Sequence, residues 1–415
     1  MQFHKRWTLA LAGWMGVYGC AGLAEEISLE AAVRRTLERN PALRAEGFAV
    51  EALETQARLD GLKPAPVLGV DLENVLGTGA LSGVHGAEAT LRLSQVIELG
   101  GKSTLRLARG RADVERQLNA GEQRRLDLAS ETTRRYIAVV EGQQELVLAE
   151  RHEKLVRETE AAVRHRVARG VAPEADQALA QIAVVRAQLA FEHAEHELAS
   201  ARFALAALWG ESTLLPIDAT GELLPLPATP QFAALAAKIG QTPETRAFTL
   251  EANRLAADRA IAVAAARPDL SLSVGVRRLE ALDDQGLVLS FGMPFGTARR
   301  SSLAVARSEA DSAALEARAE AAAFDTRQKL FARYQELRHA RTEVEAIAGR
   351  MIPAADKALK LTQAGYDDAR YSILQLTQSQ ATALQLRQEH LTAAARYHQL
   401  LAEIERATAV SGEIQ

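Results

Sequence analysis

The sequence predicts a mainly helical protein with a small β part, built from an internal duplication. The 415 residues include 48% hydrophobic, 25% charged and only 5% aromatic residues. This balance, dominated by Ala and Leu, favours long and closely packed helices over a thick globular core. Within the stretch 91–102, the apolar residues change from strict alternation to a three- or four-residue repeat. The same change recurs about two hundred residues later, which indicates the duplication.

Residues 1–24 are predicted to be a signal peptide. A basic start at 4–6 precedes the apolar run 7–17, and small residues lead up to Ala24, which is typical of a secretory signal. Cleavage after Ala24 removes Cys20, the single cysteine of the sequence, and leaves a mature chain without disulfides. The alternative interpretation is a lipoprotein signal in which Cys20 is acylated.

The first repeat is predicted at 25–210 and begins with two helices and a β-hairpin. Pro41 and Pro64 interrupt the helical pattern, because proline cannot continue a helix and restricts the residue before it. Alternating apolar residues then predict strands at about 67–76 and 87–99, joined by a Gly-rich turn.

A helix of unusual length follows the second strand. It is predicted from Lys102 to about Arg169, which at ~1.5 Å per residue makes a rod of roughly 100 Å. The chain reverses at a tip near 170, and a returning helix runs to Trp209. A rod of this length does not fit inside a compact domain.

A Pro-rich segment at 211–241 is predicted to link the two repeats. The second repeat, 242–415, restarts the pattern with strands predicted at about 269–278 and 286–295. A second long helix is predicted from about Ala298 to a tip near 369, where a last helix begins.

The predicted hairpin strands have about ten residues each, the length that a tilted strand needs to cross a bilayer. Four strands in one protomer leave two open edges, and unpaired backbone groups in lipid cost several kcal/mol each. We therefore expect several protomers to share one closed barrel. The alternative is that the hairpins are amphipathic and cap a soluble helical bundle.

This organisation resembles the TolC-type outer-membrane efflux channels over nearly all of the chain after the signal. The motif S-Q-V-I-E-L-G-G-K at 94–102 is similar to the strand-to-helix junction of the subgroup that works with heavy-metal exporters of the cobalt, zinc, cadmium or copper type. Val96 replaces the proline that is usual there. The pairs and runs at 397–398 and 403–406 also resemble that subgroup.

The resemblance implies a homotrimer in the outer membrane of a Gram-negative bacterium. Each protomer would contribute four transmembrane strands to a 12-stranded β-barrel in the lipid, and its long helical hairpins to an α-barrel in the periplasm. The implied partners are a periplasmic adaptor (membrane fusion) protein and an inner-membrane pump of the resistance-nodulation-division type. The implied function is an exit duct for heavy-metal cations.

The resemblance also assigns roles to residues at the two tips. In the first tip it implies docking of the adaptor at Gly170, Val171, Asp176 and Ala180. It implies a gate that closes the tunnel at Asp176, Tyr366, Arg370, Gln375 and Gln378. At the second turn, Ala369 stands where the family carries glycine, which tolerates a positive φ better.

Simpler roles are available for two of these residues and can coexist with the functional ones. Gly170 is expected in a left-handed turn and Asp176 at a helix start. Gln375 and Gln378 stand where some members carry aspartate, so threefold symmetry would give neutral rings without strong cation selection. We expect Asp176 to pair with Tyr366 or Arg370 on neighbouring helices in the closed state.

No nucleophile constellation, phosphate-binding loop or dinucleotide motif occurs in the sequence, so no enzymatic activity, cofactor or metal site is predicted. His193 and His196 lack the metalloprotease spacing and are interpreted as part of a solvated helix face. The Arg-rich run 164–169 is interpreted as an exposed tip face that could meet acidic residues of the adaptor. A net charge of −4 argues against nucleic acid as a partner.

Two functional classes remain open on the sequence. The first is a passive exit duct, for heavy metals or for drugs and other small molecules. The second is a periplasmic helical scaffold or adaptor protein without a barrel.

Overall fold

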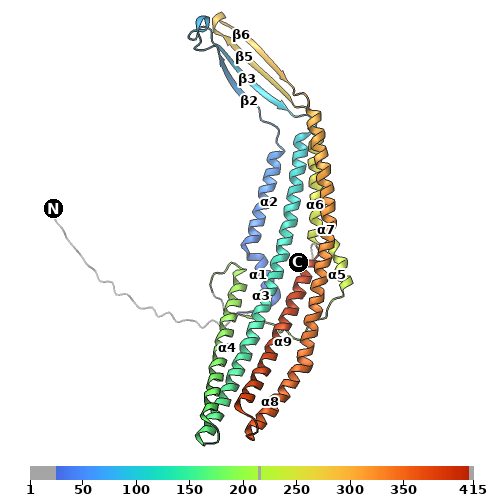
Figure 1. Ribbon diagram of the computed structural model, residues 1–415. Helices are drawn as coiled ribbons and strands as arrows, with labels where there is room; N and C mark the ends of the chain where they lie inside the picture. The colour runs from blue at the N-terminus through green and yellow to red at the C-terminus, as the bar shows by residue number, and fades with distance from the viewer. Residues whose placement is uncertain (1–24, 214–215, 411–415) are drawn as a thin grey trace, which may run out of the picture.

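The computed structural model describes residues 25–213 and 216–410, so the predicted signal peptide and Cys20 lie outside the described residues. The protomer is an elongated body with a β-sheet at one end, a long helical shaft, and two helical tips at the other end (Figure 1). The helices are α1 (Leu29–Arg39), α2 (Pro41–Asp60), α3 (Lys102–Ala168), α4 (Glu174–Ala207), α5 (Phe232–Lys238), α6 (Pro243–Ala264), α7 (Thr297–Ala346), α8 (Ile352–Asp367) and α9 (Ile373–Thr408). The strands are β1 (Glu25–Ile27), β2 (Val67–Glu73), β3 (Glu88–Ile97), β4 (Ile217–Ala219), β5 (Leu270–Leu279) and β6 (Asp284–Gly292).

The two β-hairpins form one antiparallel sheet in the order β2-β3-β5-β6. Its register places residues of like polarity side by side, with Leu68 opposite Leu93 and Val274 opposite Leu289. One face of the sheet is therefore apolar, and its side chains are exposed, Leu68 by 69% and Leu289 by 71%. In a water-soluble sheet this face would be covered, because one face of such a sheet normally packs on a core.

The opposite face of the sheet is polar. Arg92 pairs with Asp71 on β2 at 3.1 Å, and Arg277 pairs with Glu88 on β3 at 2.8 Å. Ser273 stands between Ser94 and Ser290 across three strands. The strand alternation seen in the sequence thus becomes a two-faced ribbon whose edges, β2 and β6, have no further strand beside them among the described residues.

Two strands end differently from the sequence prediction. β2 stops at Glu73 rather than about 76, because Asn74 and Leu76 take positive φ angles of 55° and 57° that break the extended backbone. β6 occupies 284–292 rather than 286–295. It starts directly after Asp283, which has a φ of 52°, and it ends before Pro294, which cannot donate a ladder hydrogen bond.

Arg106 holds the junction between sheet and shaft together. Its guanidinium bonds both carboxylate oxygens of Glu98, at 2.6 and 2.9 Å, and donates to the carbonyl oxygens of Asp60 and Leu62 at 2.6 and 3.1 Å. The two carbonyls belong to the C-terminal end of α2, where the last carbonyls of a helix lack internal partners. One side chain on α3 therefore ties the segment after β3 to the end of α2.

The glycines of the same junction turn the strand into the helix. Gly100 and Gly101 take φ angles of 86° and 70°, and Gly101 is the N-cap of α3, a conformation that glycine adopts without steric cost. Lys102 then pairs with Asp269 of the second repeat at 2.6 Å. At the corresponding junction of the second repeat, Gly296 caps α7 with a φ of 79°.

The two long helices differ. α3 is unbroken over 67 residues, as the sequence predicts. The second long helix, predicted from about Ala298 to a tip near 369, is divided, since a π-helical segment at Ile347–Met351 separates α7 from α8. Pro353 explains the break, because proline has no N–H and its ring would clash with the carbonyl four residues earlier, at Gly349 inside the π segment.

The main hydrophobic core lies in a belt halfway along the shaft, where α1, α3, α4 and α9 meet β1 and β4. Segment 211–241, expected as a linker or equatorial region, contributes β4 to this belt, where β4 pairs in parallel with β1. Its helix α5 packs in a separate cluster with α7 and α9. Buried polar groups are bonded: the indole N–H of Trp209 donates to Thr36 at 2.9 Å, and the Tyr136 hydroxyl donates to the carbonyl of Ile27 at 3.0 Å.

The junction yields a first prediction. Replacing Arg106 with alanine leaves the largely buried carboxylate of Glu98 and two helix-end carbonyls without their donor. We expect a loss of about 2–4 kcal/mol in the free energy of unfolding, somewhat less than the roughly 3–5 kcal/mol for breaking a fully buried pair, because the Arg106 side chain is 31% exposed. Chemical denaturation of the detergent-solubilised protein measures it.

Arg58→Ala is the matched control, because the side chain of Arg58 is 76% exposed and pairs with Glu54 one turn away at 3.5 Å. Such a surface pair contributes about 0–1 kcal/mol. Equal losses in the two variants would contradict the role assigned to Arg106.

Candidate functional site at the helical tips

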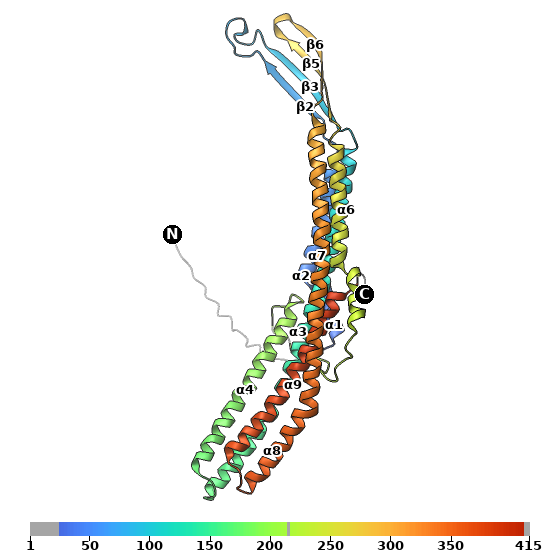
Figure 2. The same ribbon diagram turned by 45° about the vertical axis from the view of Figure 1, so that its right-hand side comes forward.

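The two tips lie side by side at the end of the shaft farthest from the sheet, as both views show (Figures 1 and 2). The first tip joins α3 to α4. The N–H of Val171 donates to the carbonyl of Arg166 and the N–H of Gly170 to that of Val167, each at 2.9 Å. Gly170 has a φ of 71°. This is the Schellman ending of a helix, so Gly170 has the turn role that its residue type predicts.

Asp176 does not cap α4. The N-cap is Pro173, and Asp176 lies in the first turn, where its N–H donates to the carbonyl of Pro173 at 3.0 Å. Pro173 displaces the helix start because its fixed φ suits the entry into a helix. The Asp176 carboxylate still lies at the positive end of the helix dipole, which stabilises it there.

The second tip, between α8 and α9, repeats the same turn. The backbone N–H of Arg370 donates to the carbonyl of Gly365 at 2.7 Å, and the backbone N–H of Ala369 donates to that of Tyr366 at 3.0 Å. Ala369 has a φ of 59°. An alanine in this conformation costs roughly 1–2 kcal/mol. The ring of Tyr371 packs so closely on Gly365 that a Cβ at position 365 would lie 2.2 Å from the ring. The turn is therefore tightly packed.

The gate residues expected at this tip separate into three environments. Arg370 forms an ion pair with Asp368 of its own turn. Gln375 closes a capping box with Ser372, in which its side chain accepts from the Ser372 N–H at 2.9 Å. Gln378 is exposed on α9. None of these three is bonded to the first tip by an interaction seen within the described residues.

Tyr366 is the residue at which the two tips meet. It is only 4% exposed and packs in a cluster with Val163, Ala180, Ile373 and Leu376 from α3, α4 and α9. Ala180, expected at the adaptor surface, is 1% exposed and belongs to this core. Val171, in contrast, is 65% exposed at the end of the first tip.

Sequence reasoning missed Arg166. Its guanidinium lies 4.7 Å from the centre of the Tyr366 ring, and its Nη1 donates to the Tyr366 carbonyl at 3.0 Å. The run 164–169 is therefore not a uniformly exposed face. The useful signal was helical spacing, because Arg166 follows the fully buried Val163 by three residues and so lies on the same side of α3.

The electrostatics of this contact keep Tyr366 neutral. Burial raises the pKa of the Tyr366 hydroxyl, the Arg166 cation lowers it in part, and the carboxylates of Asp176 and Asp367 raise it further. Asp176 is thus near enough to act on Tyr366 through its charge. Within the described part of the chain, however, the Tyr366 hydroxyl is buried without a hydrogen-bond partner.

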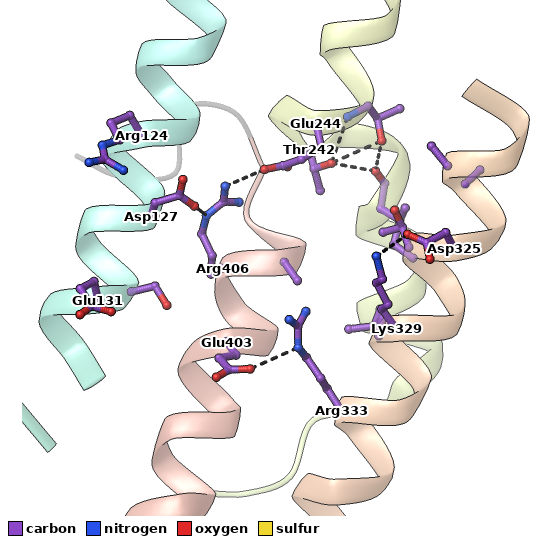
Figure 3. A pocket seen from close by; sticks show the side chains of 18 of the residues that line it. Arg124, Asp127, Glu131, Thr242, Glu244, Asp325, Lys329, Arg333, Glu403 and Arg406 are labelled. Carbon is purple, nitrogen blue, oxygen red and sulfur yellow. Dashed lines mark hydrogen bonds and ion pairs between the residues drawn. The ribbon is translucent and has the colours of Figure 1, made fainter. Parts of the chain in front are cut away.

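A second charged feature lies at the joint where the end of α9 meets the start of α6. It is a groove of about 1000 Å³ between α3, α6, α7 and α9 (Figure 3). Arg406 bonds Asp127 on α3 at 2.7 Å and Glu244 on α6 at 2.6 Å. Its neighbour Glu403 bonds Arg333 on α7 at 3.2 Å and Arg134 on α3 at 3.6 Å. These pairs fasten one helix end to three other helices.

Among residues 25–213 and 216–410, no group of three or more His, Cys, Asp or Glu is arranged to hold a metal ion. His193 and His196 are exposed on α4, and the interaction that His196 makes is with Glu192 one turn away at 3.7 Å. In the same described residues, no helix combines the length and the apolar character required to cross a membrane.

Comparisons with known proteins show which proteins this chain is similar to. Residues 32–211 match the family model described as outer membrane efflux protein. CzcC of Cupriavidus metallidurans, a cobalt-zinc-cadmium resistance protein, is 26% identical over 322 residues that cover 77% of this chain and 76% of CzcC. Residues 32–211 are therefore similar to the outer membrane efflux protein family, and the similarity to CzcC extends over 77% of the chain.

Several solved structures share the fold of this chain. A crystal structure of CusC aligns with a TM-score of 0.75 at 17% identity and covers 92% of each chain. A membrane protein of Pseudomonas aeruginosa aligns with a TM-score of 0.74 at 18% identity over 92% of this chain and 90% of its own. The open state of MtrE of Neisseria gonorrhoeae gives 0.71 at 19% identity over 92% and 88%.

Proposed function

We propose that this protein is the exit duct of a tripartite system that exports heavy-metal cations. A pump of the resistance-nodulation-division type in the inner membrane supplies the energy, and a periplasmic adaptor joins the pump to the duct. One observation carries the proposal: a sheet with one exposed apolar face is joined through a rigid junction to a long helical shaft that ends in paired tips. The likeness to CzcC, a cobalt-zinc-cadmium resistance protein, supports the choice of substrate.

The barrel of this duct is shared by three protomers. Within the part of one protomer that the structure describes, the edges at β2 and β6 have no strand beside them, and unpaired edges are not tolerated in lipid. Three copies of the four-stranded sheet, joined edge to edge, pair every strand in a closed barrel of 12 strands. The apolar face with Leu68 and Leu289 then contacts lipid, and the polar face with Arg92 and Arg277 lines the pore.

The long helices of the three protomers form the periplasmic tunnel, and the tips form its gate and docking site. Gly170, Val171, Asp176 and Ala180 shape the surface that receives the adaptor, with Val171 as the exposed contact and Ala180 as its packed support. Across the boundary between protomers, Asp176 pairs with Arg370 when the tunnel is closed. Gln375 and Gln378 keep the narrowest part neutral, so the duct passes the ions that the pump delivers without binding them.

The substrate prediction is tested by deleting the gene and measuring growth. We expect resistance to zinc, cadmium, cobalt or copper to fall several-fold and to return with the wild-type gene, because the pump then loses its exit. Resistance to dyes and antibiotics should stay unchanged. A loss confined to dyes and antibiotics would instead support a duct for drugs and other small molecules.

The barrel is tested by two neighbouring substitutions on β6. Leu289→Arg places a charge on the apolar face and is expected to cost up to about 2–4 kcal/mol at the middle of the bilayer. Heat-sensitive trimers in the outer membrane should be lost. Ser290→Arg, one residue further on the polar face, should leave the trimers intact. Trimers that tolerate both substitutions equally would contradict the proposed orientation of the sheet.

The gate is tested by conductance in planar bilayers. Asp176→Ala and Arg370→Ala each remove one partner of the proposed pair, so both trimers should conduct more than wild type. The double variant should conduct no more than the better single variant, because the two residues act through one contact. Conductance equal to wild type in both single variants would mean that a contact other than the Asp176–Arg370 pair closes the tunnel.

A further inference from the structure

The contact between Arg166 and Tyr366 joins the two halves of the duplicated chain at their far ends. Arg166 lies in the last turn of α3 and Tyr366 in the last turn of α8, 200 positions apart. The guanidinium lies 4.7 Å from the ring centre and donates to the Tyr366 carbonyl at 3.0 Å. One side chain therefore grips both the ring and the backbone of the second tip.

The atoms left out of this contact are as informative as those within it. The Tyr366 hydroxyl and the Nε of Arg166 are both buried without a hydrogen-bond partner among the described residues. The hydroxyl therefore contributes no hydrogen bond to the join between the tips of one protomer. The ring face and the carbonyl oxygen carry the polar part of that join.

The segment that Arg166 holds lies between an interruption of the helix and a tightly packed turn. Above it, the π-helical segment Ile347–Met351 and Pro353 interrupt the shaft, and such interruptions are where helices bend. Below it, the packing of Tyr371 on Gly365 makes the turn compact. Part of α9 is tied separately, since Gln380 donates to Thr159 on α3 at 2.9 Å. Arg166 holds the end of α8 itself.

We propose that Arg166 is a positioning residue of the gate: it holds Tyr366, and with it the tip of α8, against α3 in the closed arrangement. Opening of the second tip then requires the guanidinium to leave the ring and the carbonyl together. The proposal rests on the exit-duct function and adds to it a contact within one protomer, distinct from the Asp176–Arg370 pair between protomers.

Arg166→Gln is the principal variant, with Arg164→Gln as its matched control. Arg164 lies two residues earlier on α3, its side chain is 59% exposed, and its ion-pair partner is Glu160 at 3.8 Å. In bilayer recordings of purified trimers, we expect Arg166→Gln to raise the ratio of open to closed states about tenfold, equivalent to about 1.4 kcal/mol. Arg164→Gln should record as wild type.

Three further variants separate the ring contact from other roles. Arg166→Lys keeps the charge but lacks the planar fork that stacks and donates at once, so it should give an intermediate ratio. Tyr366→Phe keeps the ring and the carbonyl and should close like wild type. Tyr366→Leu removes the ring and should open as Arg166→Gln does, with no further increase when the two are combined.

Hydrogen exchange of the same trimers provides a readout that does not depend on conduction. Segment 361–372 should exchange faster in Arg166→Gln and at the wild-type rate in Arg164→Gln, because the tip of α8 loses its hold only in the first. Unchanged exchange and conductance in Arg166→Gln would overturn the proposal about Arg166. If the wild-type trimers form pores in the same recordings, this result would not contradict the duct function. Equal opening by Tyr366→Phe and Tyr366→Leu would also overturn it, by assigning the hold to the hydroxyl. Wild-type trimers that form no pores would overturn the duct function, and the gating role of Arg166 with it.

Discussion

The unpaired backbone edges of the sheet are the constraint on which the rest of the structure depends. A four-stranded sheet with one apolar face is satisfied neither in water, where the face is exposed, nor alone in lipid, where the edges are. The junction between sheet and shaft connects this sheet to the helices. Arg106 ties the end of β3 to α2, and Lys102 ties the start of α3 to Asp269 before β5. These bonds link each strand hairpin to the long helices, so in the proposed trimer the pairing of sheets between protomers also sets how their shafts meet.

The contacts that stabilise the shaft are grouped in separate regions along its length. The apolar belt around Trp209 and Tyr136 supplies the largest core, and the Arg406 and Glu403 pairs fasten the adjacent joint. Toward the tips the buried cluster shrinks to Val163, Ala180, Tyr366, Ile373 and Leu376. A few side chains can decide the arrangement there, since little buried apolar area competes with them.

Local sequence patterns predicted the elements well because helix and strand periods are local properties. The alternation around Leu91 and the helical repeat after Lys102 depend on neighbours within a turn or two. The family resemblance then supplied the arrangement that periodicity alone does not contain. Pro353 was visible in the sequence, but its effect was missed because the surrounding apolar repeat continues on both sides of it.

The tip contacts could be predicted only in part. Gly170 was predicted at its turn because glycine is preferred at positive φ angles, whereas Ala369 was placed at the second turn by its correspondence to a glycine of the family. The partner of Arg166 lies 200 positions away, and no local pattern pairs a cation with a distant ring. The resemblance assigned Gln375 to the gate, and its side chain also bonds the backbone of Ser372 in a capping box. A capping box competes with other roles for the same amide, and the sequence does not reveal which one prevails.

The break between α7 and α8 has a consequence for how a duplicated protein diverges. The two repeats began with the same plan, yet only the second contains the π segment and Pro353, while α3 remains continuous. Helices bend where such interruptions occur, so the second repeat contains a bending point that the first repeat lacks at the corresponding place. In the proposed duct, duplication thus separates two requirements that conflict in a single rod: the continuous helix of the first copy keeps the wall rigid, and the interrupted helix of the second copy can bend.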